Sequence, residues 1–233
     1  MKAMILAAGR GERMRPLTDS CPKPLLCVGG KPLIEWHLER LARAGFHEII
    51  INHAHFGHLV EETLGDGHEW GLSIRYSPEA EALETAGGIA QALTLLGDAP
   101  FLVVNGDVYC EIDYATFCAR GIARLTQGRH AHLALVDNPP HHPQGDFVLD
   151  ASGLILREGG AALTFSGIGL YRPSLFTGIA AGSKAKLAPL LFTGIENGLV
   201  SGEHYRGRWE DVGTPERLHT LDAELKQRFP AQT

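Results

Sequence analysis

The residues best suited to bind a phosphate follow a short apolar run near the N-terminus. The run at 3–8 is typical of a strand buried on both faces, and Gly9 and Gly11 come directly after it. Because glycine has no Cβ, backbone N–H groups beside it can approach a phosphate closely. Three cations follow within eleven positions: Arg13, Arg15 and Lys23. The segment predicts a phosphate-binding loop, with a solvated basic surface loop as the alternative.

This loop belongs to neither of the two common glycine-rich types. The P-loop pattern GxxxxGK[ST] is missing, and the dinucleotide fingerprint lacks its third glycine and the helix that should begin at once. Pro22 and Pro24 bracket Lys23 and restrict its backbone, which would aim the ammonium at a fixed point. Glycine spacing alone does not choose between the two interpretations, because short glycine motifs often match by chance.

Two further groups of polar residues stand at the ends of strands. Asn105-Gly106-Asp107 ends the predicted strand at 101–105, and Asp211-Val212-Gly213 stands at another strand end. Ligands of open parallel sheets bind beyond the carboxyl ends of the strands, so we expect these groups and the glycine-rich loop to face one site. Taken alone, Asp107 is equally well interpreted as a turn residue after a strand.

The elements that position these residues alternate between strand and helix over the first two-thirds of the chain. Apolar spacing marks a helix at 32–44, with Pro32 near its first turn and Gly45 after its end. The same patterns predict strands at 48–52, 72–76, 101–105 and 132–136, and helices at 56–64, 85–96 and 114–126. This repeated β-α order predicts an α/β fold with a mostly parallel central sheet flanked by helices.

The order of elements changes after Asp137. Residues 147–149 and 154–156 are expected to form a hairpin, 163–171 a longer strand, and 215–228 a final helix capped by Thr214. No internal repeat or linker is visible. The sequence therefore predicts a single domain over 1–233 with a more irregular second half.

Composition and charge argue against several classes of protein. The 233 residues carry a formal net charge of −6, which indicates no general nucleic-acid surface. The N-terminal apolar run is too short for a signal peptide or a membrane span, and four cysteines without a CxxC pair favour a reduced, cytoplasmic location. No base pattern accompanies those cysteines, which argues against a catalytic thiol. His53, His55 and His58 lie close together, but surface or structural roles are favoured over a zinc site.

A longer string of residues is more specific than the glycine spacing. A strand leads into G-x-G-x-R-x-x-P-x-T, then P-K-P, then a P-L-I helix start. The matching residues are Gly9, Gly11, Arg13, Pro16, Thr18, Pro22-Lys23-Pro24 and Pro32-Leu33-Ile34. This order resembles the sugar-1-phosphate nucleotidyltransferases, also called nucleoside-diphosphate-sugar pyrophosphorylases. The resemblance continues through Glu81, Thr85-Ala86-Gly87, Asn105-Gly106-Asp107 and Trp209 to Thr214, and so covers nearly the whole chain.

The resemblance implies a fold and a reaction. The fold is a Rossmann-like, glycosyltransferase-A-like domain with a nucleotide-binding part at about 1–110. A sugar-binding part at about 111–233 includes a small antiparallel portion and the second metal ligand. In the family reaction a nucleoside triphosphate and a sugar 1-phosphate give a nucleotide sugar and pyrophosphate. The attacking phosphate oxygen is ionised at neutral pH, since its second pKa is about 6, so no general base is needed. Cations and carboxylates therefore become the residues of interest.

Individual roles follow from the same resemblance. Arg13, on the leaving pyrophosphate, and Lys23, near the α-phosphate, are the catalytic candidates, and Asp107 and Asp211 would jointly hold Mg²⁺. Nucleotide contacts are expected from Ala8, Gly9, Gly11, Glu12, Arg13, Lys23, Glu81, Gly87 and Gly88. Glu81 is the candidate acceptor for a uracil N3–H. Substrate contacts are expected from Asn105, Gly145, Asp146, Ser166 and Arg206.

One departure from the family pattern leaves a role open. Many members carry a Glu-Lys-Pro segment whose Lys binds the sugar phosphate, whereas this chain has Arg157-Glu158-Gly159-Gly160 before the strand at 163–171. The strings INHAHFG, LVDNPPHH and SGEHYRGRWEDVGT are most similar to members that use UTP and N-acetylmuramate α-1-phosphate in peptidoglycan recycling. That sugar adds a lactyl carboxylate, for which Arg206 is preferred over Arg208, His141 and His142.

Two other functions stay open at this point. The chain could transfer a nucleotide to another sugar 1-phosphate, such as that of mannose, glucose or a heptose. It could instead be a catalytically silent subunit that senses a nucleotide sugar, although the presence of Arg13, Lys23, Asp107 and Asp211 argues against that reading. The expected partners are UTP and a sugar 1-phosphate, without nucleic acid or membrane, in a monomer or weak homo-oligomer.

Overall fold

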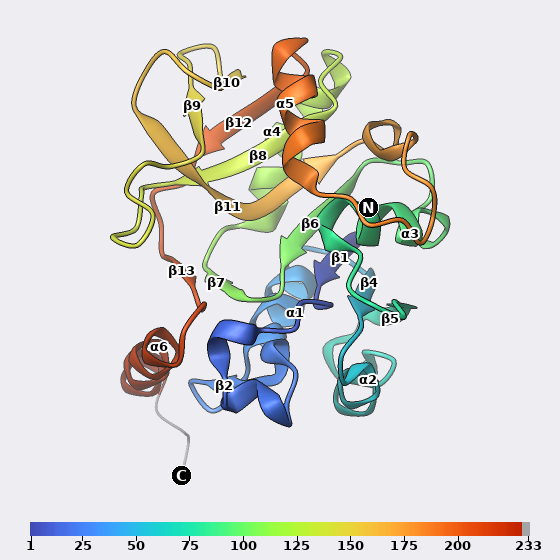
Figure 1. Ribbon diagram of the computed structural model, residues 1–233, viewed down its shortest axis with the longest axis vertical. Helices are drawn as coiled ribbons and strands as arrows, with labels where there is room; N and C mark the ends of the chain where they lie inside the picture. Colours follow the sequence, from blue (N-terminus) through green and yellow to red (C-terminus); the bar gives the residue numbers. More distant parts are fainter. Residues whose placement is uncertain (230–233) are drawn as a thin grey trace.

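The computed structural model describes residues 1–229 and is built around one large mixed sheet (Figure 1). The strands of this sheet are β1 (Ala3–Leu6), β4 (Glu48–His53), β5 (Ser73–Pro78), β6 (Phe101–Asn105), β8 (Ala131–Val136), β9 (Phe147–Leu149), β10 (Ile155–Leu156), β11 (Ala162–Tyr171) and β12 (Val200–His204). Two short ladders stand apart from it. They join β2 (Cys27–Val28) to β3 (Lys31–Pro32), and β7 (Val108–Cys110) to β13 (Trp209–Asp211).

The centre of the sheet is parallel, in the order β6-β1-β4-β5. Strands β4 and β6 are rich in isoleucine, valine and phenylalanine, which suit a pleated sheet buried on both faces. Strand β11 runs antiparallel to β6, and it also pairs antiparallel with β8 and, near its start, with β9. The expected α/β fold, with a mostly parallel sheet and a small antiparallel portion, is confirmed.

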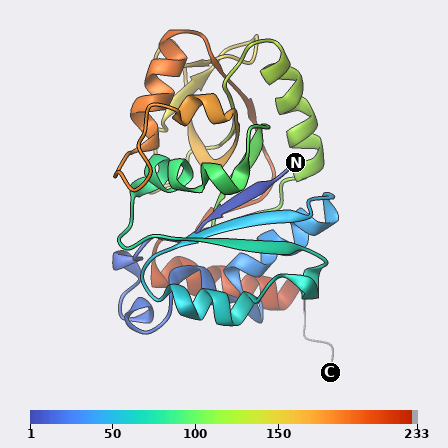
Figure 2. The ribbon, with the colours of Figure 1, turned by 90° about the vertical axis from the view of Figure 1, so that its right-hand side faces the viewer.

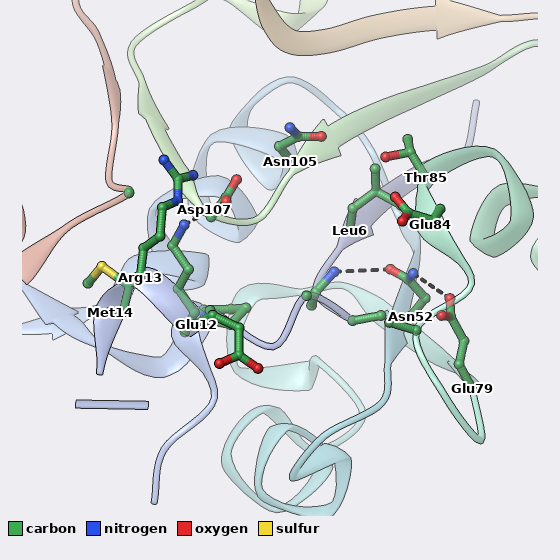
Figure 3. Close-up of a pocket in the computed structure, with 18 residues that line it drawn as sticks. Leu6, Glu12, Arg13, Met14, Asn52, Glu79, Glu84, Thr85, Asn105 and Asp107 are labelled. Carbon is green, nitrogen blue, oxygen red and sulfur yellow. Dashed lines mark hydrogen bonds and ion pairs between the residues drawn. The ribbon is translucent and has the colours of Figure 1, made fainter. Parts of the chain in front are cut away.

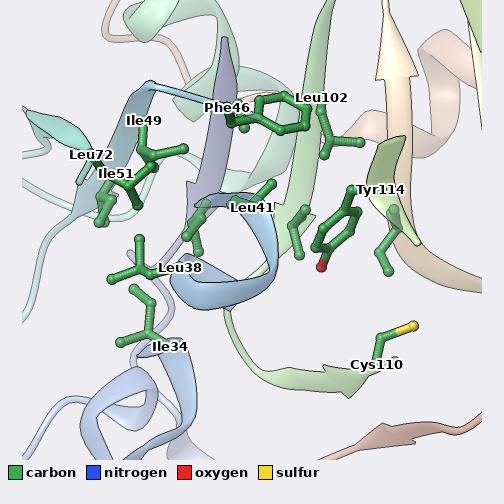
Figure 4. Packing of buried hydrophobic residues seen from close by; sticks show 14 of the residues in the cluster. Ile34, Leu38, Leu41, Phe46, Ile49, Ile51, Leu72, Leu102, Cys110 and Tyr114 are labelled. Atoms are coloured by element: carbon green, nitrogen blue, oxygen red, sulfur yellow. The ribbon is translucent and has the colours of Figure 1, made fainter. Parts of the chain in front are cut away.

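Helices cover both faces of the parallel strands (Figure 2). They are α1 (Leu33–Arg43), α2 (Gly57–Leu64), α3 (Glu84–Leu96), α4 (Tyr114–Thr126), α5 (Leu187–Glu196) and α6 (Pro215–Arg228). Because side chains alternate along a strand, Ala3 and Ile5 of β1 join a core with α1, α2 and α4, whereas Met4 joins a core with α3 and α5. Figure 4 shows Ile34 and Leu38 of α1 packed in the first of these cores.

The last helix returns to the N-terminal part of the chain, as Figure 1 shows. Leu218, Leu221 and Leu225 of α6 are buried with Met14, Val28 and Trp36 in a third apolar cluster. Residues that precede α6 are therefore held beside the glycine-rich loop, which lies about two hundred positions earlier in the chain.

The helices expected at 114–126 and 215–228 have the predicted bounds, and the Thr214 side chain accepts from Arg217 N at the start of α6. The strand expected at 3–8 is wrong at its end, because Ala7 N donates to the Asn52 side chain instead of continuing a ladder. Helix α5 and strands β7 and β12 were not predicted. Pro189 and Gly194 interrupt the helical pattern of α5, and β7 and β12 have only three and five residues.

Buried cysteines and the histidine cluster behave as structural groups. Burial raises the pKa of the Cys110 and Cys118 thiols to about 12, so both stay protonated at neutral pH and neither is a nucleophile. His53 pairs with Glu61 through Nε2, at 2.6 Å. Within residues 1–229, no helix combines the length and apolarity needed to cross a membrane.

His37 links three elements beneath the strand that follows Asp107. Its Nε2 lies 2.7 Å from the carbonyl oxygen of Val108, and its Nδ1 lies 2.9 Å from the Tyr114 hydroxyl. Because a carbonyl only accepts, Nε2 carries the proton and Nδ1 accepts from the tyrosine. Complete burial, together with the nearby Arg40 charge, lowers the pKa of His37 to about 4. The His37 ring is therefore neutral in the folded protein at neutral pH.

We predict that this buried histidine makes the protein less stable in mild acid. An unfolded histidine has a pKa of about 6.5, so the unfolded chain binds the extra proton first as the pH falls. The free energy of unfolding should decrease between about pH 6.5 and pH 4, by on the order of 3 kcal/mol in full. Urea unfolding of the wild type and of His37→Gln across this range measures the effect. The variant should start less stable and lose less, and equal losses would contradict the assignment.

Candidate active site

A cavity of about 400 Å³ opens where the glycine-rich loop meets the carboxyl ends of the parallel strands (Figure 3). Leu6 at the end of β1 is in register with Asn52 of β4 on one side and with Asn105 of β6 on the other. Both asparagines line the cavity. The polar strand ends expected to face one site meet here only in part. Gly9, Gly11, Glu12, Arg13, Asn105 and Asp107 line the cavity, but of the group at 211–213 only Gly213 does, and Asp211 does not.

The glycine-rich loop is folded back onto Lys23. Gly11 has φ +68°, and a Cβ there would lie 3.0 Å from Thr18 Cγ2 and 3.3 Å from Lys23 Cβ. The Thr18 hydroxyl donates to the Gly11 carbonyl at 2.9 Å and closes the loop. Glycine is required at this position both for its left-handed backbone and for the close approach of Lys23.

Lys23 is the most enclosed cation of the cavity. Its side chain is 8% exposed, and its Nζ lies 2.6 Å from Asp107 Oδ2. An enclosed ammonium needs a paired charge to offset its desolvation, and Asp107 supplies it. Arg13 extends beside Asp107, as Figure 3 shows. Arg15, by contrast, pairs with Glu12 and Asp19 and does not line the cavity.

The β7–β13 ladder brings Asp211 beside Asp107. Asp211 is opposite Val108 in this ladder, and Val212 N donates to the Asp107 carbonyl at 3.1 Å. Asp211 Oδ2 also lies 2.8 Å from Arg217 Nη1 and 3.3 Å from His141 Nε2. Two carboxylates at adjacent strand ends offer the hard oxygen donors that a divalent cation prefers. The donor set fits such an ion, which commonly takes only one or two protein carboxylates.

A second polar network supports the opposite wall. Asn52 Oδ1 accepts from Ala7 N at 3.0 Å, and Asn52 Nδ2 donates to Glu79 Oε1 at 2.7 Å. The other Glu79 oxygen accepts from Leu83 N at 2.8 Å. This network ties the loop before α3 to the end of β1. Sequence reasoning missed Asn52 and Glu79, although Asn52 ends the strand predicted at 48–52 just as Asn105 ends the one predicted at 101–105.

Six of the predicted nucleotide-binding residues line the cavity and three do not. The six are Ala8, Gly9, Gly11, Glu12, Arg13 and Lys23. Glu81 lies outside, because its carboxylate is 70% exposed and pairs with Lys184 at 2.7 Å. Gly87 packs on the backbone of Ser183 and donates to Ala185, and Gly88 packs behind the cavity against Glu79.

The residues expected to contact the sugar are less well gathered. Asn105 lines the cavity, where it packs against Gly167, a glycine whose Cβ would overlap the amide. Gly145, Asp146, Ser166 and Arg206 do not line it. The Ser166 hydroxyl is buried and donates to the Ala134 carbonyl, and Asp146 accepts from Phe165 N. Arg206 is exposed and makes no hydrogen bond or ion pair within residues 1–229. Arg217 and His141 lie beside Asp211, where neither of them was expected from the sequence.

Comparisons with known proteins agree with this arrangement. A family model described as nucleotidyl transferase matches residues 2–228. The chain is 59% identical to the N-acetylmuramate α-1-phosphate uridylyltransferase of Neisseria meningitidis serogroup B, over 96% of this chain and 97% of that protein. It is 34% identical to the protein of the same description from Caulobacter vibrioides, over 97% of each. A Bacillus anthracis structure described as a glucose-1-phosphate thymidylyltransferase shares the fold, with a TM-score of 0.83 at 23% identity and coverage of 100% of this chain and 97% of that one.

We predict that Gly88→Ala disturbs the wall of the cavity. A Cβ at Gly88 would lie 2.6 Å from Glu79 Oε1 and 2.8 Å from Asn52 Nδ2, so the network must shift. Crowding of this kind costs about 1–3 kcal/mol, which should outweigh the roughly 1 kcal/mol gained from alanine in a helix. Calorimetric melting measures the loss. The control is Gly178→Ala, where the new Cβ meets nothing within 4 Å. Equal melting temperatures for the two variants would contradict the prediction.

Proposed function

The chain belongs to the nucleotidyl transferase family, and on that premise we propose that it transfers UMP from UTP to N-acetylmuramate α-1-phosphate, giving UDP-N-acetylmuramate and pyrophosphate. Enzymes of this family join a nucleoside triphosphate to a sugar 1-phosphate. The choice of UTP and the muramate sugar rests on the 59% identity to the Neisseria uridylyltransferase over nearly all of both chains. This reaction would serve peptidoglycan recycling.

The single structural observation that supports the proposal is the pairing of carboxylates and cations at one edge of the cavity. Asp107 with Lys23 and Asp211 with Arg217 stand next to each other around the end of the β7–β13 ladder. A site for two polyanionic substrates needs fixed positive charge and little else, because the attacking phosphate oxygen is already ionised. No serine, cysteine or histidine nucleophile is required.

In this proposal the glycine-rich loop holds the triphosphate. Gly9, Gly11, Glu12 and Arg13 line the cavity, and in the proposal their backbone N–H groups bind phosphate oxygens while Lys23 binds the α-phosphate. Arg13 neutralises the charge that develops on the departing pyrophosphate. The loop and the two cations thus supply orientation and electrostatic stabilisation, the main contributions to phosphoryl-transfer catalysis.

Asp107 and Asp211 are the proposed ligands of Mg²⁺. Family members generally use a divalent metal, and Mg²⁺ is the hard ion that suits two carboxylates and phosphate oxygens. When bound, such an ion supplies positive charge that stabilises the transferring phosphate. The chain's own part is to keep both carboxylates at fixed backbone positions, which the ladder between β7 and β13 does.

The uracil is proposed to lie between Ala8 and the loop before α3. A uracil offers an N3–H donor and two carbonyl acceptors, so it calls for a carboxylate and for backbone N–H groups. Glu79 and Glu84 both line this wall, and the Glu79 carboxylate is fixed by Asn52 and Leu83, whereas Glu81 pairs with Lys184 at the surface. We therefore assign the acceptor role to Glu79 in place of Glu81.

The test of this proposal is pyrophosphate release with UTP, Mg²⁺ and a panel of sugar 1-phosphates. We expect a strong preference for N-acetylmuramate α-1-phosphate. In Asp107→Asn we expect kcat/KM to fall by about a hundredfold or more, because the variant keeps the side-chain shape but loses the charge. Preference for another sugar or nucleotide would overturn the substrate and keep the reaction class. Silence with every pair would favour a regulatory, nucleotide-sugar-sensing subunit.

A further inference from the structure

Arg217 is a cation beside Asp211, one of the proposed metal ligands, and the proposed nucleotide contacts give it no role. It lies on the first turn of α6, where the Thr214 cap fixes the start of the helix. Its Nη1 donates to Asp211 Oδ2 at 2.8 Å and lies 2.6 Å from His141 Nε2. The guanidinium is therefore held between β13 and the loop that connects β8 to β9.

The backbone leaves this guanidinium close to the cavity. Gly213 lines the cavity, and a Cβ on it would overlap Arg217 Nη2 and lie 3.1 Å from Asp211 Oδ2. A larger residue at position 213 would therefore push the Arg217 guanidinium away from the wall of the cavity. The Arg217 side chain is 24% exposed and His141 is 41% exposed, so both can be reached by a ligand.

The pairing with Asp211 leaves most of the arginine unused. A guanidinium has five N–H donors in a planar fork, which matches the oxygens of a phosphate or carboxylate. Only Nη1 makes hydrogen bonds within residues 1–229, while Nε and Nη2 make none. A carboxylate that binds a divalent ion also no longer depends on the arginine for its counter-charge.

We propose that Arg217, with His141 beside it, binds the anionic group of the sugar 1-phosphate, and that it exchanges its contact with Asp211 for this group. This inference rests on the proposed function. The cations proposed to face the triphosphate, Arg13 and Lys23, come from the N-terminal loop, and Lys23 pairs with Asp107, whereas Arg217 comes from α6 and pairs with Asp211. The second polyanion then has a cation of its own. Neither Arg206 nor Arg217 lines the cavity itself, but Arg217 contacts Asp211 and lies against Gly213 of the lining, whereas Arg206, expected for this role from the sequence, is exposed.

The test compares Arg217→Gln and Arg217→Lys with the wild type under saturating UTP and Mg²⁺. For Arg217→Gln we expect the KM for N-acetylmuramate α-1-phosphate to rise roughly 10- to 100-fold, as for the loss of a charge-assisted hydrogen bond. The KM for UTP should change less than about threefold, and the lysine variant should recover part of the loss. Arg120→Gln is the control. Arg120 lies on α4, away from the cavity, and it also pairs with a carboxylate, that of Glu203.

Three outcomes decide the inference. If Arg217→Gln shifts only the Mg²⁺ dependence or kcat and leaves the KM for the sugar phosphate unchanged, the arginine serves Asp211 alone and the proposal is overturned. A loss that is equal for N-acetylmuramate and N-acetylglucosamine 1-phosphates assigns the arginine to the phosphate. A loss confined to the muramate substrate assigns it to the lactyl carboxylate.

A second readout needs no turnover. The rise in melting temperature caused by N-acetylmuramate α-1-phosphate in the presence of Mg²⁺ and without UTP should be smaller for Arg217→Gln than for the wild type and for Arg120→Gln. If the wild type turns over a different nucleotide and sugar pair, the proposed substrate fails, and the same KM ratios with the active pair still test Arg217. The failure of the proposed function and the failure of this inference are thus distinguishable.

Discussion

The fold has to bring the backbone of Asp211 to that of Asp107, from a distant part of the chain, and to balance the charge of each carboxylate. Pairing of β7 with β13 sets Asp211 next to Asp107, and each carboxylate has a cation of its own in Lys23 and Arg217. Arg217 lies only six positions after Asp211 in the sequence, whereas Lys23 comes from a distant segment. Lys23 reaches Asp107 across 84 positions, from a segment restricted by two prolines. The charge balance of the site therefore depends on tertiary contacts.

Much of the remaining architecture serves these contacts. Gly11 leaves room for Lys23, and Gly213 leaves room for Arg217. Helix α6 presents Arg217 correctly only because Leu218, Leu221 and Leu225 are buried against the N-terminal region around Trp36. The packing of this apolar face holds the segment before α6, including Asp211, near the glycine-rich loop. It thereby also fixes the position of the Arg217 charge beside Asp211.

The sequence predicted the parts of the fold that are set by local patterns. The apolar run before Gly9, the spacing of 114–126 and the Thr214 cap are local signals, and they predicted the strand, the helix and the helix start. The choice between Glu79 and Glu81 was not local. It depends on Asn52, which donates to Glu79 from a strand 27 positions away, and on Gly88, which leaves space behind the carboxylate. The choice between Arg206 and Arg217 likewise depends on the path of the chain after β13.

The order of functions across the cavity follows from the register of three strands. Asn52 of β4 and Asn105 of β6 flank Leu6 of β1 at the same level, and the phosphate-binding loop continues from β1 between them. Asn52 supports the wall proposed for the base, while Asn105 lies on the side of Asp107, proposed for the sugar phosphate. A nucleotide joined to a sugar through its phosphates has the same order of base, phosphate and sugar. On the proposed function, strand order β4-β1-β6 matches the order of base, phosphate and sugar in the product, and the N-terminal loop binds the phosphates at the centre.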